Sequence, residues 1–197
     1  MKKIMCAALL LCFFSLLNGQ DNNITNKLGA SGNFKVLKSD NSTELLKVAE
    51  ATGLISGSKV AFTPEGGIAV RMINKTGTSV KGTIVTSYGS TVDNACVLSP
   101  IASTGGDRPF GVMYEADIPD GSLCWVVVAG IADVLLQTTL YSTTVSPGYV
   151  VMASSTVVGR ADSYQDPTAS THDRECGHFL ESKSSGNQLV KVALHFR

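Results

Sequence analysis

The chain has 197 residues, with 16 Lys and Arg against 16 Asp and Glu, and 44% of its residues are hydrophobic. This length fits one domain, or one domain with a small extension, and it can bury a core without metals or disulfides. The balanced charge argues against nonspecific nucleic-acid binding, and the hydrophobic content argues against a disordered chain.

Residues 1–19 have the pattern of a secretory signal peptide. Lys2 and Lys3 precede an apolar run over residues 4–17, and Gly19 precedes Gln20. The run is too short to cross about 30 Å of hydrocarbon as a helix. We therefore expect cleavage before Gln20, a secreted or cell-surface protein, and no membrane span after cleavage. The alternatives are a retained N-terminal anchor and a lipoprotein signal at Cys12.

The first strands are predicted just after the signal. Two β-type runs, residues 34–38 and 44–48, flank a Ser-Asp-Asn-Ser turn, so residues 33–49 are predicted to form a hairpin. The competing interpretation is a short helix over residues 42–51, which Thr43 would cap.

A boundary between two parts of the chain is predicted at residues 64–67, Pro-Glu-Gly-Gly. Before it, Gly53 and Gly57 separate two short runs. We expect residues 20–65 to form an N-terminal β extension or stalk. We expect residues 66–197 to form the main β module.

The rest of the chain alternates short apolar runs with turn sequences, and no long stretch has helical periodicity. Such spacing predicts an all-β fold, either a β-sandwich or a small tulip-like barrel with a short N-terminal β extension. Strands are predicted at residues 68–73, 80–86, 95–98, 110–114, 123–136, 149–152, 156–158, 176–181 and 189–196.

Several of these segments carry finer expectations. Gly82 indicates a bulge or a close approach of two backbones. Gly130 either bends one long strand, the favoured interpretation, or forms a tight hairpin. Residues 162–171 are predicted to be a polar loop. The last strand alternates strictly between two faces and pairs in a hairpin with the strand before it.

The mature chain would keep three cysteines, Cys96, Cys124 and Cys176. An odd number excludes a disulfide framework. Cys96 and Cys124 lie in apolar runs and are interpreted as small core residues. A Cys96–Cys124 bridge is allowed by the sequence but nothing in it indicates one.

The densest group of chemically active side chains is the segment His-Asp-Arg-Glu-Cys-Gly-His at residues 172–178. His172, Cys176 and His178 are candidate zinc ligands. On a strand Cys176 and His178 would share a face, but two ligands do not close a site, so we expect no metal there. A nucleophilic Cys176–His178 pair lacks an orienting group and is not expected.

Other signs of catalysis are weak. Trp125 lies in an apolar strand and is interpreted as a core residue. The aspartates fall mainly near turns, and a glycosidase-type carboxylate pair stays open: Asp93, Asp107, Asp117, Asp120, Asp133 and Asp162. Sequons, which matter only in a glycosylating secretory pathway, begin at Asn23, Asn41 and Asn74.

A set of motifs in the second half of the chain resembles structural modules of tailed-phage virions, of the capsid cement, head-decoration or fibre type. In order along the chain these are a "GV-Y-E" strand, a "DG" turn and a "V-V-V-x-G-I-A-x-V" strand. They lie at residues 111–115, 120–121 and 125–136, and further matching segments lie at 148–151, 159–162, 175–182 and 189–196. The resemblance covers about residues 66–197. It implies an oligomeric, all-β virion-surface protein without catalytic residues.

Residues 23–34 resemble the start of secreted, fibre-like surface proteins of Bacteroidetes-type bacteria. In such proteins a signal is followed by a short, strand-rich stalk that is often trimeric. A phage-derived module exported by its host would combine both resemblances.

The sequence thus predicts a non-enzymatic structural protein, on a virion or exported to a surface, with no catalytic, metal or cofactor site. The alternatives are a secreted adhesin or glycan-binding domain and, third, a secreted hydrolase. Residues 125–136 are apolar on both faces, so one face can meet the core and the other needs either the N-terminal extension or a neighbouring subunit. Both resemblances imply oligomers, and we therefore expect a homo-oligomer, with a trimer favoured and residues 20–63 in the contact.

Overall fold

The computed structural model describes residues 32–37, 44–49, 51–89, 92, 94–100, 108–137, 144–165, 174–183 and 186–196. Within these residues the chain forms strands β1 to β13 and no α-helix, so the predicted all-β class is confirmed. The strands belong to one mixed sheet instead of two separate ones. The predicted signal, residues 1–19, lies outside the described residues.

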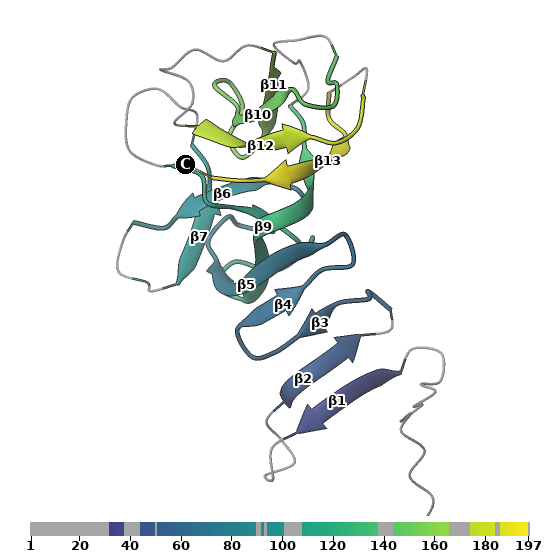
Figure 1. Cartoon of the computed structure of the whole chain (residues 1–197). Helices are drawn as coiled ribbons and strands as arrows, with labels where there is room; N and C mark the ends of the chain where they lie inside the picture. Colours follow the sequence, from purple (N-terminus) through teal and green to yellow (C-terminus); the bar gives the residue numbers. More distant parts are fainter. Residues whose placement is uncertain are drawn as a thin grey trace, which may run out of the picture.

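An antiparallel meander leads away from the body of the molecule (Figure 1). Its strands, called the N-terminal sheet below, are β1 (Asn33–Leu37), β2 (Glu44–Ala49), β3 (Ile55–Ser56) and β4 (Val60–Phe62). The pairing of β1 with β2 confirms the predicted hairpin, and the competing helix is wrong for residues 44–49. The short N-terminal β extension is therefore present.

The predicted boundary at residues 64–67 is a tight turn between paired strands, because β4 continues into β5 (Gly67–Asn74). Thr63 holds this turn. Its carbonyl oxygen accepts a hydrogen bond from Gly66 N at 3.0 Å, and its Oγ1 accepts one from Gly67 N at 2.9 Å.

Five strands form a closed circuit of pairings in the order β5–β7–β6–β8–β9–β5. The further members are β6 (Ile84–Ser87), β7 (Ala95–Leu98), β8 (Gly111–Met113) and β9 (Leu123–Leu135). The β5–β7 pair is parallel and the other four are antiparallel. Each strand sends side chains into one cluster, formed by Met72, Val85, Cys96, Met113, Cys124 and Val126.

The second half of β9 continues the sheet in the order β9–β13–β12–β10–β11. These strands are β10 (Val150–Ala153), β11 (Ala161–Tyr164), β12 (Glu175–Phe179) and β13 (Leu189–Leu194). A parallel bridge between Leu136 and Ala161 brings β11 back beside the end of β9. The predicted closing hairpin is confirmed as β12 and β13, and Val190, Val192 and Leu194 point into the larger core cluster.

Strand β9 is one long strand bent at Gly130, as predicted. Gly130 has a φ of +82°, a conformation that favours glycine. A Cβ at this position would lie 2.4 Å from Gly66 O, so the bend also needs the missing side chain. The bend lets one strand serve both halves of the body.

Three segments differ from the predicted strands, each for a local reason. Residues 80–83 form a turn before β6, in which Thr83 Oγ1 donates to Val80 O at 2.9 Å. Residues 156–158 are a turn because Ser154 Oγ accepts hydrogen bonds from the backbone amides of residues 156 and 157. The predicted loop at residues 162–171 begins inside β11, whose buried Asp162 and Ser163 hide the strand in the sequence.

Both apolar faces of β9 are covered by the chain itself. Cys124 and Val126 belong to the smaller cluster, while Trp125 and Val127 belong to the larger one. Leu54, from the N-terminal sheet's connecting turn, joins Trp125 in that larger cluster. The sequence left the second face of β9 to be covered by either the N-terminal extension or a neighbouring subunit. The chain's own strands bury both faces, and Leu54 takes part in this, so the burial of β9 does not require a second subunit.

Candidate functional site

One face of the N-terminal sheet, together with the adjoining strand β5, carries a row of apolar side chains across five strands. Directly paired residues share a face, and the pairs link Phe34, Val48, Ile55, Phe62 and Ile68 in succession. We call these five residues the apolar ladder. Phe62 is 56% exposed and Ile55 and Ile68 are about 40% exposed, whereas Phe34 and Val48 are partly buried. At about 4.8 Å per strand, the ladder runs for roughly 19 Å.

A second row lies on the same face. Val36 pairs with Leu46, and Val60 pairs with Val70, in each case two residues along from the ladder. Val36, Leu46 and Val60 are exposed. The sheet thus presents a broad apolar surface instead of scattered apolar residues.

The opposite face of the same sheet is different. There the pairs link Lys35, Lys47, Ser56, Ala61 and Ala69. Ala61 and Ala69 are fully buried in the larger core cluster, and the two lysines lie farther out along the sheet. The N-terminal sheet is therefore amphipathic. One face packs on the body near β4 and carries lysines on β1 and β2, and the other face is apolar and exposed to solvent.

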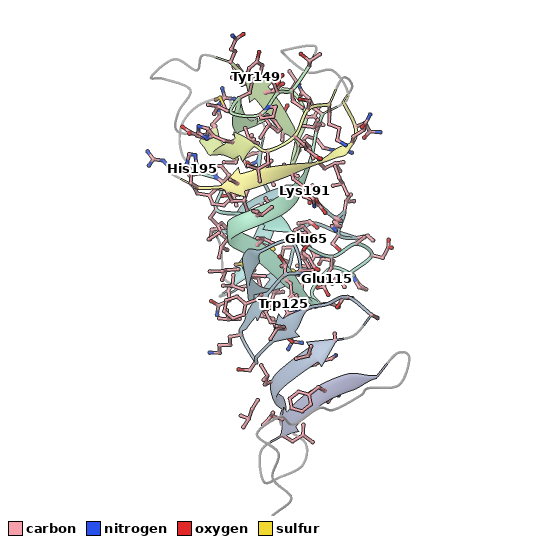
Figure 2. All side chains as sticks on the ribbon, turned by 45° about the vertical axis from the view of Figure 1, so that its right-hand side comes forward. Glu65, Glu115, Trp125, Tyr149, Lys191 and His195 are labelled. Atoms are coloured by element: carbon pink, nitrogen blue, oxygen red, sulfur yellow. The ribbon has the colours of Figure 1, made fainter. Side chains whose placement is uncertain are left out.

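A charged cluster lies on the body beside the turn at residues 64–67. Asp133 Oδ2 is 3.1 Å from Lys81 Nζ, Asp133 Oδ1 is 3.2 Å from Lys191 Nζ, and Lys81 Nζ is 3.9 Å from Glu65 Oε1. Burial opposes ionisation of Asp133, but the hydrogen bonds from the two lysines outweigh it, so the pKa of Asp133 is lowered. Figure 2 shows Glu65 and Lys191 on this side of the body.

Two open grooves lie next to each other on the body, each about 630 Å³ in volume. The first runs along β5 and is lined mainly by apolar side chains with Lys59 and Arg71. The second includes Tyr88, Arg108 and Phe110. Both are shallow surfaces and neither encloses a carboxylate among its described lining residues.

The predicted zinc candidates are not brought together as the sequence suggested. Cys176 is fully buried in the larger core cluster, whereas His178 is partly exposed, so they do not share a face. Burial raises the pKa of the Cys176 thiol, which disfavours its ionised, reactive form. His172 lies outside the described residues. The structure instead places His178 beside Glu175 and His195. The sequence did not predict this group, because His195 follows the end of β13, seventeen residues after His178.

The other residues singled out from the sequence have structural surroundings. Trp125 is buried, as predicted, and the guanidinium of Arg71 lies 5.7 Å from its ring centroid. Asp120 pairs with Lys75 at 3.0 Å, and Asp162 accepts a hydrogen bond from Gln137 in a buried network. Asp93 and Asp107 lie outside the described residues. Cys96 and Cys124 are free, buried thiols in contact.

The described part of the chain contains no helix that is long and apolar enough to cross a membrane. Comparison with known protein families, with curated proteins and with solved structures finds nothing that matches this chain.

Proposed function

We propose that the chain is a non-enzymatic structural protein that forms a homo-oligomer through the apolar face of its N-terminal sheet. Its setting would be a virion surface, as a capsid-decoration or fibre-like component, or a cell surface, as a phage-derived exported protein. The observation that carries the proposal is the exposed apolar ladder. An apolar surface spread over neighbouring strands is characteristic of a contact that is made in the assembled protein.

A second copy of the same chain is the occupant that fits this face best. Burying Ile55, Phe62 and their neighbours against the same residues of other copies removes apolar area from water without leaving charges buried. Three amphipathic sheets around a threefold axis would hide every apolar face and keep Lys35 and Lys47 outward. A trimer is therefore the favoured state, in keeping with the stalk-like resemblance of residues 23–34.

Substitutions on the two faces of one strand test the proposal. Ile55 is on the apolar ladder, and its neighbour Ser56 is on the opposite face. Ile55→Asp should convert the oligomer to a monomer at micromolar concentration in sedimentation, because it would place a charge in an apolar contact. Ser56→Asp is the matched control and should leave the oligomer intact.

A chain that sediments as a monomer before any substitution would contradict the proposal. Equal effects of the two substitutions would also contradict it, since the contact would then not use the apolar face. Circular dichroism of each variant checks that the body stays folded.

Export is part of the proposal and has its own test. Expression of the chain in its natural host, followed by mass spectrometry, should find the mature chain beginning at Gln20. An intact Met1 on protein recovered from the cytoplasm would exclude export.

The second candidate function is that of a secreted adhesin or glycan-binding domain. It is favoured by the groove that Tyr88, Arg108 and Phe110 line, because an aromatic ring with nearby hydrogen-bond donors suits a sugar. Binding on a glycan array that is lost in Tyr88→Ala, with the oligomer unchanged, would favour this alternative.

A further inference from the structure

Three metal-ligating atoms from two strands meet at one point on the closing hairpin. They are Glu175 Oε1, His178 Nδ1 and His195 Nε2, and suitable ligand atoms of the three residues all lie within 4.8 Å of one another. His195 Nε2 is 3.0 Å from His178 Nδ1 and 3.3 Å from Glu175 Oε1. Figure 2 shows His195 on the side of the body away from the N-terminal sheet. The cluster is thus separate from the proposed assembly surface.

A β-bulge in β12 creates this convergence. Val151 pairs with Gly177 and the next residue, Met152, pairs with Glu175, so Cys176 is an extra residue in the strand. In a regular strand Glu175 and His178, three residues apart, would point to opposite faces. The extra residue turns both toward His195, while Cys176 enters the core.

Gly177, which has no side chain, allows β12 and β13 to approach each other closely at the bulge. Its φ is +149°, and a Cβ there would lie 2.1 Å from Ala193 O. Next to it, His195 N donates to Cys176 O at 3.0 Å, which fixes the backbone that carries His195. The three ligand-bearing positions are therefore set by backbone hydrogen bonding and not by the side chains alone.

The two separations at His195 Nε2 are also those expected between ligands of one metal ion. If His195 Nε2 carries a proton, it can donate a well-directed hydrogen bond to only one of its two close neighbours, His178 Nδ1 or Glu175 Oε1. A tetrahedral ion with bonds of about 2.0–2.1 Å has ligands about 3.3–3.4 Å apart, which is close to the two separations at His195 Nε2. The third pair of ligand atoms, on His178 and Glu175, lies within 4.8 Å, so a small rotation of the two partly exposed imidazoles would bring all three atoms within bonding distance of one ion.

The ligand types indicate the class of metal. Two imidazoles and one carboxylate are typical ligands of Zn²⁺ and neighbouring divalent transition metals, whereas Ca²⁺ and Mg²⁺ prefer sites made of oxygen atoms. Glu175 is only 3% exposed, while the His195 side chain is 44% exposed. The carboxylate is thus held from inside the protein, and an ion bound here could take a fourth ligand from solvent.

We propose that Glu175, His178 and His195 bind one divalent transition-metal ion, with Zn²⁺ as the best match, and that this ion clamps the start of β12 to the end of β13. The proposal departs from the expectation, drawn from the sequence, of no metal site near residues 172–178. That expectation considered His172, Cys176 and His178 and had no ligand from a second strand to complete the set.

Isothermal titration of the untagged, metal-free chain with ZnCl₂ tests the proposal. One ion per chain should bind, and thermal unfolding should move to higher temperature with Zn²⁺ and return with EDTA. Co²⁺ should bind competitively and give the visible absorption of a four-coordinate site. His178→Ala and His195→Ala should each weaken Zn²⁺ binding by more than about 100-fold.

The chain contains a third histidine that serves as the matched control. His172→Ala should bind Zn²⁺ as the unsubstituted chain does. Glu175→Gln, which keeps the side-chain volume, should weaken binding while the metal-free protein stays folded. Absence of saturable Zn²⁺ binding would overturn the proposal, and so would binding that survives both His178→Ala and His195→Ala or depends on His172.

Discussion

Cys96 Sγ lies 3.9 Å from Cys124 Sγ, although their strands, β7 and β9, do not pair with each other. Both strands flank β5, and both sulfurs lie in the smaller core cluster. If the chain is exported as proposed, these two thiols would meet an oxidising environment, and their sulfurs would need to approach to about 2.05 Å to form a disulfide.

We therefore predict that oxidative refolding of residues 20–197, which contain three of the five cysteines, joins Cys96 to Cys124 and leaves Cys176 as a free thiol. Two thiols would transfer two hydrogens to oxidised glutathione, and mass spectrometry after alkylation would identify the bridged peptides. The already folded, reduced chain should oxidise slowly, because both thiols are buried away from a dissolved oxidant. Cys96→Ser is the control. Three alkylated cysteines after oxidative refolding would show that the core does not accept the bridge.

Asp133 gives the stability of the body a defined dependence on pH. Its pKa is lowered in the folded chain, so the stabilisation is present above the ordinary carboxyl range and is lost as pH falls through the folded-state pKa. Asp133→Asn should lower the free energy of unfolding by about 1–2 kcal/mol at neutral pH, and the difference should vanish in acid. Urea denaturation across the pH range measures it.

The matched control for that experiment is Asp120→Asn. Asp120 also pairs with a lysine, but its side chain is 51% exposed. Solvent screens such a pair, so its substitution should have little effect. If Asp120→Asn lowered the free energy of unfolding as much as Asp133→Asn does, the effect of Asp133 would not be due to its burial.

Asn74, the last residue of β5, is predicted to hold the turn after β5 against the loop between β8 and β9. Its Nδ2 donates to Gly77 O at 2.7 Å and Ile118 O at 2.8 Å, and its Oδ1 accepts from Thr76 N. The residue is fully buried. Asn74→Ala should cost about 2–4 kcal/mol of unfolding free energy, because these backbone groups would lose their partner. Chemical denaturation measures it, and Lys75→Ala, with its exposed ion pair to Asp120, should cost far less.

Gly130→Ala should destabilise the body by about 2–4 kcal/mol. The added methyl group would meet Gly66 O, and the φ of +82° is unfavourable for alanine. Gly77 has the same φ with open space around it. Gly77→Ala should therefore cost only about 1–2 kcal/mol, and the difference between the two variants in thermal unfolding measures the steric part. Equal losses would exclude a steric role for the approach of Gly66 to Gly130.

Local patterns in the sequence were enough to predict several elements. The turn residues between β1 and β2, the glycine inside the apolar run of β9 and the alternation in β13 each depend on neighbouring residues only. Strand β11 was missed for the opposite reason. Its Asp162 is polar in sequence, and its burial depends on Gln137, which donates to it from a distant part of the chain.

The candidate metal site could not be predicted because its geometry depends on register. An alternating pattern places Cys176 and His178 on one face. The bulge at Cys176 reverses that relationship, and only the pairing of β12 with β10 and β13 reveals it. The apolar ladder was hidden in the same way, since Ile55 and Phe62 become neighbours only through strand pairing.

Strand β9 contributes to both halves of the body, and this gives the protein a definite order of opening. Neither half can release β9 without exposing part of the other half's core, so the amides of β9 should exchange with deuterium only in global unfolding. The N-terminal sheet is held to the body chiefly through β4 and β5, and in an isolated chain it should exchange first. Association of the chains would then appear as slower exchange confined to β1 through β4, which makes hydrogen exchange a direct view of how assembly completes the fold.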